Sequence, residues 1–419
     1  MENITDVRIK KISDIVDEYI QCINSIRETL RNSLPLLQKL DIRAKNSLKN
    51  FINKYDKEEL KNIPPTQIKE LKTIIRTAER ADLAVILFPQ SMLVSLVSQY
   101  DNLIGQLVRF IYDINPNLLN ESNSQISYKE LFTYHDIDTI RNNIIQGKIE
   151  TILRKSHEEQ IDDLQKLSGV KNLKGVSFWK EFIEITQRRN LLVHCKGCVS
   201  EQYIKECKNV GIALLPSKGE ILSVDENYFN RAYFVFYTMG VLLSQVLTRH
   251  LLEKEKLVEE IDAVLTNIIY ETLEDGEYDL TIELSNFALS KDTEHACRLD
   301  EVYFVLNFAQ AYKWQGNQQK CNEILSNFDF SAMTPDILVA KFALEDDIQE
   351  VVKQMKKVGD DSKIMTKAAY ASWVIFKDMR ERKEFGETYK EIFKEDLIQN
   401  ILTPEENKVV QELESGTGD

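Results

Sequence analysis

The sequence predicts an all-α protein, and three observations support this fold class. Glycine and proline are scarce, with 14 and 8 residues among 419. Sandwiches and barrels need many tight turns, so this scarcity argues against an all-β fold. Apolar residues recur at helical spacing along most of the chain. Apolar residues make up 43% and charged residues 29%, which is typical of globular proteins, and the length predicts at least two domains.

Helices are expected in succession along the first 255 residues. The predicted ranges are 4–33, 36–56, 66–84, 90–114, 136–167, 178–195, 200–209 and 226–255. Pro35 and Pro89 mark two of the breaks, because proline ends or kinks a helix. The polar stretch 115–126 predicts a loop. The apolar run 232–247 predicts a buried helix, since polar side chains interrupt it and it is too short to span a bilayer.

Charge is divided unevenly between the two halves of the chain. The 53 basic and 67 acidic residues give a net charge of −14, of which residues 1–250 carry +3 and residues 251–419 carry −17. Because an acidic surface repels phosphate backbones, any nucleic-acid contact is expected in the first half. The six cysteines are too few for a disulfide framework, and the first residues lack an apolar signal segment. We therefore expect a cytoplasmic protein with no membrane partner.

Two segments of the acidic half share one pattern. Residues 276–289 and 316–325 each begin with glycine, and a compact residue, Thr281 or Cys321, follows five places later. The two glycines are 40 residues apart. The first segment resembles the tetratricopeptide repeat through Gly276, Tyr278, Asp279, Ile282, Ala288 and Leu289, and the second through Ala311, Tyr312, Gly316 and Leu325. The resemblance implies an array of helical hairpins that presents a surface to a protein partner.

One short motif carries the chemical signal. Arg189-Asn190-x3-His194 lies near the end of a predicted helix. It resembles the signature of the HEPN family of all-helical ribonucleases and nucleotide-binding proteins, in which an Arg, often followed by Asn, precedes a His by a few residues. The downstream residues that fit bacterial members of this family are Gly197, Val199, Ser200 and Tyr203. The chain then divides into a helical extension at 1–85, a HEPN-like domain at 86–255, a tetratricopeptide-like domain at 256–403 and an acidic tail at 404–419.

The resemblance implies a metal-independent endoribonuclease without a cofactor, in which Arg189 and His194 are catalytic. The ribose 2′-OH would attack the adjacent phosphate and leave a 2′,3′-cyclic phosphate and a 5′-OH end. A histidine can take or return the proton at neutral pH, and an arginine can hold the phosphate and stabilise its charge. Asn190 can orient His194 or the phosphate, because the two residues are i and i+4 and share a helix face.

The family resemblance also implies a homodimer. On an ideal helix Arg189 and His194 point about 140° apart, so a single helix does not bring the two side chains together. Two copies of the helix across a twofold axis would line one groove with both residue types, and HEPN ribonucleases generally have composite sites of this kind. In bacteria the resemblance further implies a role in phage defence, in a toxin–antitoxin system or in growth arrest.

Basic residues around the motif are candidates for binding RNA. Between residues 171 and 196 six basic residues outnumber two acidic ones, which gives a local charge of +4. We single out Lys180, Arg188 and Lys196 in this group. Arg188 can replace Arg189 in the phosphate role, and a solvated surface charge is its alternative.

Asp101 is the remaining candidate for the site. It lies at the edge of the apolar stripe of the predicted helix 90–114. Because a bare carboxylate is costly to bury, Asp101 needs a cationic or hydrogen-bonding partner. We expect it to hold Arg189 or His194, and a salt bridge to an unrelated Lys or Arg is the alternative.

Other hypotheses remain open. The residues His194, Cys195, Cys198 and Cys207 form the pattern H-C-x2-C-x8-C, which could supply four zinc ligands, although no second Cys-x2-Cys follows. A thioredoxin-like redox site lacks a βαβ context. The main alternative function is a non-catalytic adaptor that dimerises and binds a protein or nucleotide. The other histidines, which are His135, His157, His250 and His295, are expected to be surface or structural residues.

Overall fold

The structure is a computed structural model that describes residues 4–55, 63–119, 136–252, 255–291 and 293–397. Within these ranges the chain is helical, and its β pairing is limited to one isolated bridge between Cys198 and Ile221. The predicted all-α class is therefore confirmed. The chain divides into two compact units, residues 1–257 and 258–419. The division falls two residues from the boundary expected at residue 255.

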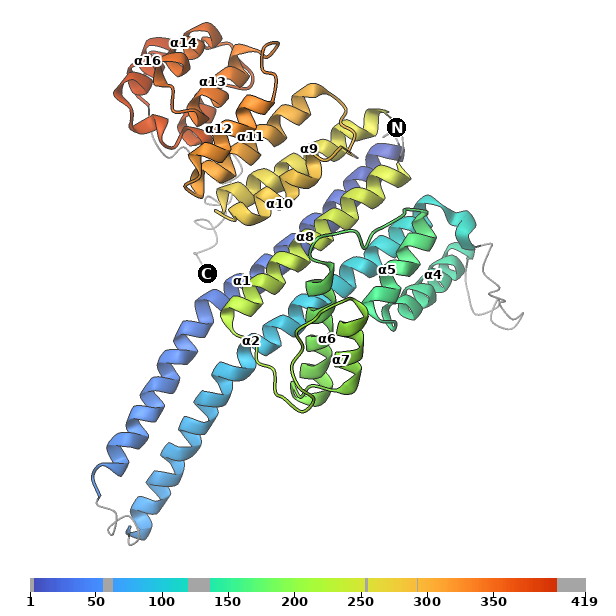
Figure 1. Ribbon diagram of the computed structural model, residues 1–419, viewed down its shortest axis with the longest axis vertical. Coiled ribbons are helices and arrows are strands. Elements are labelled where there is room, and N and C mark those ends of the chain that lie inside the picture. Colours follow the sequence, from blue (N-terminus) through green and yellow to red (C-terminus); the bar gives the residue numbers. More distant parts are fainter. Residues whose placement is uncertain (1–3, 56–62, 120–135, 253–254, 292, 398–419) are drawn as a thin grey trace. The chain divides into compact units, whose positions relative to one another are not determined.

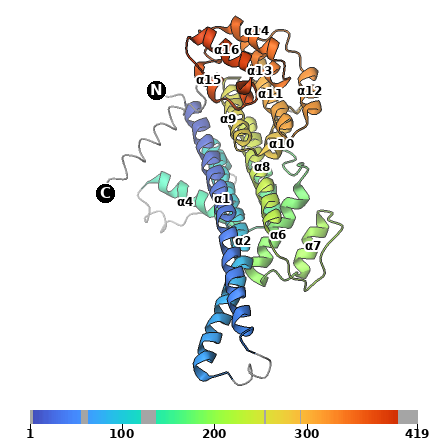
Figure 2. The same cartoon turned by 90° about the vertical axis from the view of Figure 1, so that its left-hand side faces the viewer.

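Unit 1 contains eight helical elements within its described residues. They are α1 (Ile4–Ile52), α2 (Pro65–Ile114), the 3-10 turn η2 (Pro116–Leu119), α4 (Ile137–Leu153), α5 (His157–Ser168), α6 (Trp179–Cys195), α7 (Glu201–Asn209) and α8 (Glu226–Leu251). Helices α1 and α2 lie side by side, and α8 packs against both of them (Figure 1, Figure 2). Helices α4, α5 and α6 also pack against α2, which is therefore the central helix of this unit.

Helices α1 and α2 run through the prolines at which the sequence predicted breaks. The breaks predicted at Pro35 and Pro89 are wrong, because both prolines lie inside continuous helices. A proline inside a helix removes one backbone hydrogen bond and costs about 3 kcal/mol. Leu34 and Ala44, on either side of Pro35, are buried, and so is Pro89 itself. Packing between the two helices offsets the local cost, and the boundary expected after residue 85 falls inside α2.

The single helix predicted at 136–167 is two helices in the structure. Helix α4 ends at Leu153 and α5 begins at His157. Ser156 caps α5, since its hydroxyl accepts from the Glu159 amide while the Glu159 carboxylate accepts from the Ser156 amide. This reciprocal arrangement satisfies amides that a helix start leaves unpaired. The Ser-x-x-Glu signature was available in the sequence, but the continuous apolar spacing obscured it.

Two helices of unit 1 are rich in apolar residues. The run 232–247 lies within α8 and is almost entirely buried, as predicted. Of the described helices, α2 alone is long and apolar enough to cross a membrane by length and composition. Within unit 1 this helix packs against α1, α6 and α8, and 22% of its most apolar 18-residue window is buried.

Helix α8 approaches α1 closely at Gly240. A Cβ atom at this position would collide with the ring of Tyr19. The Tyr19 hydroxyl donates to the Phe236 carbonyl across the same contact, at 2.8 Å. The ring therefore occupies the space that a side chain at position 240 would need.

Unit 2 is a series of helical hairpins. Its helices are α9 (Glu255–Glu274), α10 (Tyr278–Ala288), α11 (Arg298–Trp314), α12 (Gln318–Asn327), α13 (Pro335–Leu344), α14 (Ile348–Val358), α15 (Lys367–Ser372) and α16 (Lys383–Phe393), with 3-10 turns η3 (Val374–Phe376) and η4 (Met379–Glu381). Gly276 and Gly316 lie in the turns after α9 and α11 with φ of 75° and 83°. Thr281 and Cys321 are fully buried, as their predicted place at a helix contact requires.

A third hairpin, α13–α14, has no glycine in its turn. Asp346 takes the left-handed conformation there, with φ of 60°. Aspartate tolerates this region better than most residues do. The glycine pattern therefore found two hairpins and missed the third. The predicted acidic tail at 404–419 lies outside the described residues.

Candidate active site

Helix α6 carries the Arg-Asn-x3-His motif and is anchored along its inner face. Phe182, Ile183, Ile185 and Leu191 are buried against the rest of unit 1. The helix ends at Cys195, and Lys196 follows in the left-handed conformation with φ of 50°. The motif therefore occupies the last two turns of a helix whose opposite face is fixed in the core.

The chain beyond α6 is also held in place. Gly197 has φ of 77°, and a Cβ atom there would lie 2.8 Å from the carbonyl oxygen of Leu222. The Leu222 amide donates to the Gly197 carbonyl at 2.9 Å, and the Val199 amide donates to the Glu220 carbonyl at 2.8 Å. Only glycine fits this close pairing of two backbone segments without displacement.

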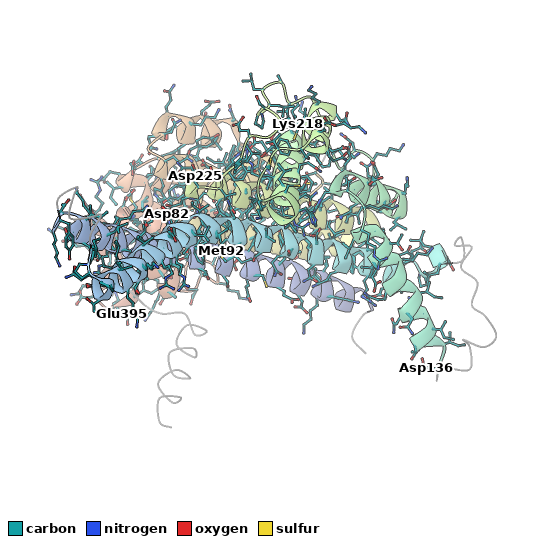
Figure 3. The ribbon with its side chains drawn as sticks, turned by 90° about the horizontal axis from the view of Figure 1, so that it is seen from below. Asp82, Met92, Asp136, Lys218, Asp225 and Glu395 are labelled. Carbon is teal, nitrogen blue, oxygen red and sulfur yellow. The ribbon has the colours of Figure 1, made fainter. Side chains whose placement is uncertain are left out.

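The pairing involves the loop between α7 and α8, which the sequence predicted at 210–225. Lys218 and Asp225 of this loop lie on the same side of α2, whose course is marked by Asp82 and Met92 (Figure 3). Asp225 accepts from the Tyr228 amide and caps α8. The loop thus connects the start of α8 to the segment that follows His194.

Arg189 is positioned by Asp101 and Asn190. Its Nη2 lies 3.5 Å from Asp101 Oδ2, and its Nη1 donates to Asn190 Oδ1 at 3.2 Å. The contact between Asp101 and Arg189 that the sequence predicted is therefore present. A guanidinium has five N–H donors, and these two contacts use two of them. Arg189 Nε is buried and has no hydrogen-bond partner among the described residues, although the side chain as a whole is 23% exposed.

His157 is a third member of this cluster, which sequence reasoning missed. His157 Nε2 lies 3.0 Å from Asp101 Oδ1, and the His157 side chain is 7% exposed. Neither atom has a well-aligned hydrogen bond in the described chain, so their contact is electrostatic. A carboxylate oxygen at this distance requires a proton on Nε2, because two acceptors would repel each other. Asp101 therefore lies between two basic side chains, one deep and one near the surface.

Aromatic side chains exclude water from the deep end of the cluster. The His157 ring lies 6.2 Å from the ring of Tyr100 and 6.1 Å from that of Phe182, measured between centroids. Tyr100 and Phe182 are fully buried. A carboxylate beside such a surface interacts more strongly with a guanidinium than it would in water. The Arg189 guanidinium is thus oriented by a carboxylate whose side chain is 24% exposed.

His194 lies at the other end of the motif and is exposed. No described residue forms a hydrogen bond or an ion pair with it. Asn190, one turn earlier on the same face, is partly exposed and already accepts a hydrogen bond from Arg189. Helix α6 therefore carries an arginine held by Asp101 and Asn190 and, five residues later, an unengaged histidine; on a regular helix two such positions point about 140° apart.

Arg188 is held by several contacts within the protein. Its Nε donates to Glu184 Oε1 at 2.9 Å, its Nη1 donates to the Ser223 carbonyl at 2.9 Å, and its guanidinium stacks 4.0 Å above the Tyr228 ring. The side chain is 17% exposed. The alternative of a solvated surface charge is therefore wrong, because the guanidinium is engaged by Glu184, Ser223 and Tyr228.

Glu184 is the centre of this second cluster, which the sequence analysis did not identify. It accepts from Arg188 and from the hydroxyls of Tyr203 at 2.7 Å and Tyr228 at 2.6 Å. Burial, with a further contribution from Glu184, raises the pKa of both tyrosines above the ordinary value, so both remain neutral donors. The cluster fastens α7 and α8 to α6. The i, i+4 spacing of Glu184 and Arg188 was the available signal.

The two lysines singled out for RNA binding are both exposed. Lys180 Nζ donates to the Gly211 carbonyl at 3.1 Å, which places it over the loop after α7. Lys196 directly follows α6 and has no ion-pair partner among the described residues. Lys196 follows His194 by two residues, and its side chain, unlike that of Lys180, has no hydrogen-bond or ion-pair partner among the described residues.

The cysteines near the motif do not form the zinc site considered above. Cys195 is exposed, whereas Cys207 is fully buried among Leu191, Val199, Tyr203 and Leu222. Burial, assisted by Glu184, raises the pKa of the Cys207 thiol to about 11. Nowhere in the described ranges do three His, Cys, Asp or Glu side chains gather as a metal site requires.

No known family model, curated protein or solved structure matches this chain. The Asp101–Arg189–His157 cluster and the exposed end of α6 are the features of this chain that bear on its function.

Proposed function

We propose that this chain is a metal-independent endoribonuclease of the HEPN type, with RNA as its substrate and Arg189 and His194 as its catalytic residues. Arg189 would hold the scissile phosphate with the donors that Asp101 and Asn190 leave unused. His194 would take the proton from the ribose 2′-OH or return one to the leaving oxygen. DNA lacks the attacking hydroxyl, so it would not be cleaved.

One observation carries this proposal. Arg189 is held by a partly buried carboxylate and has a buried Nε without a partner among the described residues, while His194, on the same two turns of α6, is exposed and unengaged. The neighbouring arginine differs at Nε: Arg188 Nε donates to Glu184, whereas Arg189 Nε is buried without a hydrogen-bond partner among the described residues. The pair therefore has the character of a binding group and a proton-transfer group that await a ligand.

In this proposal Asp101 and His157 are positioning residues. They lie behind Arg189 and fix the direction of its guanidinium. A guanidinium that is fixed before the substrate arrives stabilises transition-state charge without reorganisation. Because Arg189 and His194 lie on different faces of α6, the complete site would need both residue types from a homodimer formed through unit 1.

The test is cleavage of total RNA and transfer RNA in EDTA. We expect the wild type to produce 2′,3′-cyclic phosphate ends and His194→Ala to be inactive. His250→Ala is the matched control, because His250 is also an exposed histidine in the last turn of a helix. Equal cleavage by wild type and His194→Ala would refute the proposal.

Expression of the active protein tests the proposed biological role. A regulated toxin or antiviral effector should arrest growth of the expressing cell, and His194→Ala should relieve the arrest. If neither protein cleaves RNA or arrests growth, the non-catalytic adaptor becomes the better proposal. The helical hairpins of unit 2 would then be the surface that binds a protein partner.

A further inference from the structure

Unit 2 contains a cavity of about 390 Å³ that the proposed nuclease chemistry does not use. Its lining residues come from α9, α11 and α13 and from the segment 363–375. A volume of this size accommodates a small molecule.

The lining combines aromatic faces with amide side chains. Tyr303 and Trp373 contribute aromatic surface, while Asn307 and Gln310 contribute primary amides. An aromatic or heterocyclic ring is the ligand body that such faces stack against. A primary amide both donates and accepts, so it can pair with a ring edge that carries an acceptor next to a donor.

Gln310 provides an independent sign that the cavity is a ligand site. The residue is 2% exposed, and its Nε2 has no hydrogen-bond partner among the described residues. A buried donor without an acceptor is destabilising, and native proteins rarely retain one without a reason. Gln310 lines the cavity, so a bound molecule could supply the acceptor.

The charge of the lining limits the ligand further. Unit 2 lies in the acidic half of the chain, yet the lining residues include no aspartate or glutamate and one lysine, Lys363. Lys363 is exposed and forms no ion pair with a described residue, unlike Lys313 and Lys341, which pair with Asp346 and Glu345. The lining therefore favours an anionic ligand over a cationic one.

We infer that this cavity binds a small molecule with a planar aromatic body, a hydrogen-bonding edge and one anionic group. The ring lies against Tyr303 and Trp373, the edge accepts from Gln310, and the anion faces Lys363. A nucleoside monophosphate and an aromatic carboxylate share this chemistry. The inference is independent of the nuclease proposal, because every residue in it belongs to unit 2.

The experiment is isothermal titration of the full chain with two sets of probes. AMP, GMP, CMP and UMP form one arm, and indole-3-acetate and 4-hydroxyphenylacetate form the other. We expect saturable binding in one arm, which identifies the anion as phosphate or carboxylate. Lys363→Ala should weaken binding about tenfold and leave the affinity of the uncharged analogue, adenosine or indole-3-acetamide, unchanged. Lys377→Ala, which removes an exposed lysine outside the cavity, is the control.

Gln310→Met separates a ligand-binding role from a structural one. The substitution keeps the approximate volume and removes the unpaired donor, so it should raise the melting temperature of the free protein. It should also weaken the probe about tenfold. Binding should persist in Arg189→Ala, which distinguishes this cavity from the nuclease site. The inference is overturned if no probe binds more tightly than about 1 mM, or if Gln310→Met and Trp373→Ala both leave the affinity unchanged.

Discussion

Asp101 contacts two basic side chains, so its charge determines how Arg189 is held. We expect Asp101→Asn to lower the RNA cleavage rate by about tenfold to a hundredfold, because the amide keeps the shape of the side chain but loses the charge that orients the guanidinium. The measurement is single-turnover cleavage, with thermal melting to show that the fold is retained. Asp113→Asn is the control, since Asp113 lies on the same helix and pairs with Lys11 away from the site. Full activity of Asp101→Asn would remove Asp101 from the site.

The cysteines allow a test that does not depend on activity. Cys207 and Cys321 are buried, and burial raises the pKa of each thiol to about 11, whereas Cys195 and Cys297 are exposed. Only the thiolate is alkylated, so raised pKa values leave almost none of it at pH 8. Iodoacetamide should therefore label the two exposed cysteines first, as followed by mass spectrometry. Equal labelling of all four in the folded protein would contradict the described burial.

At the scale of single residues, a contact was predictable from the sequence where the geometry of one helix defined it. The position of Asp101 on the apolar edge of its helix predicted a cationic partner, and Arg189 is that partner. His157 and Glu184 were missed because their partners come from other segments of the chain. No local spacing joins His157 to Asp101, and the partners of Glu184 on α7 and α8 become neighbours only after folding.

At the scale of elements, the turn after α6 is the most constrained part of the site. We expect Gly197→Ala to lower the free energy of unfolding by about 2 kcal/mol, because the residue has a left-handed backbone and the added Cβ meets the Leu222 carbonyl. Cleavage should fall as well, since the backbone pairing beyond His194 is disturbed. Denaturant titration measures the first effect. Gly219→Ala is the matched control, because Gly219 also has a positive φ but has open space around its Cβ position.

Element boundaries were predictable from the sequence only where local signals agreed with packing. Helix α6 was predicted within one residue, because its apolar face and the glycine beyond its end point to the same boundaries. The breaks at Pro35 and Pro89 were wrong, since long-range packing between α1 and α2 outweighs the local preference of proline. The break between α4 and α5 was missed because a capping serine lies within an apolar pattern that continues past it.

At the scale of the whole molecule, the proposed composite site can be tested by mixing two inactive proteins. Arg189→Ala and His194→Ala each remove one residue type from both halves of a homodimer. A heterodimer of the two retains one site with both residues if the site is shared across the twofold axis. We expect such a heterodimer to recover about half of the wild-type activity, because one of two symmetric sites is intact. Separately tagged chains, co-expressed and purified through both tags, provide the sample.

The result of that experiment distinguishes two arrangements. If Arg189 and His194 of one protomer act together, each protomer of the heterodimer lacks one catalytic residue and no activity returns. The control for contamination by host ribonucleases is a dimer in which both chains carry His194→Ala, prepared with the same two tags. If the wild type remains monomeric at the concentrations at which it cleaves RNA, the composite site is excluded.

The contact of Tyr19 with Gly240 offers a way to find relatives of this protein. The Tyr19 ring on α1 occupies the space that a side chain at position 240 on α8 would need. Any related chain that packs these two helices in the same way must therefore keep a small residue at the position of Gly240. A search template can therefore combine this pair with Asp101 and the Arg189-Asn190-x3-His194 string, in chain order and with variable spacing. Such a template selects sequences by what the packing and the site require, even where overall identity is too low for an alignment.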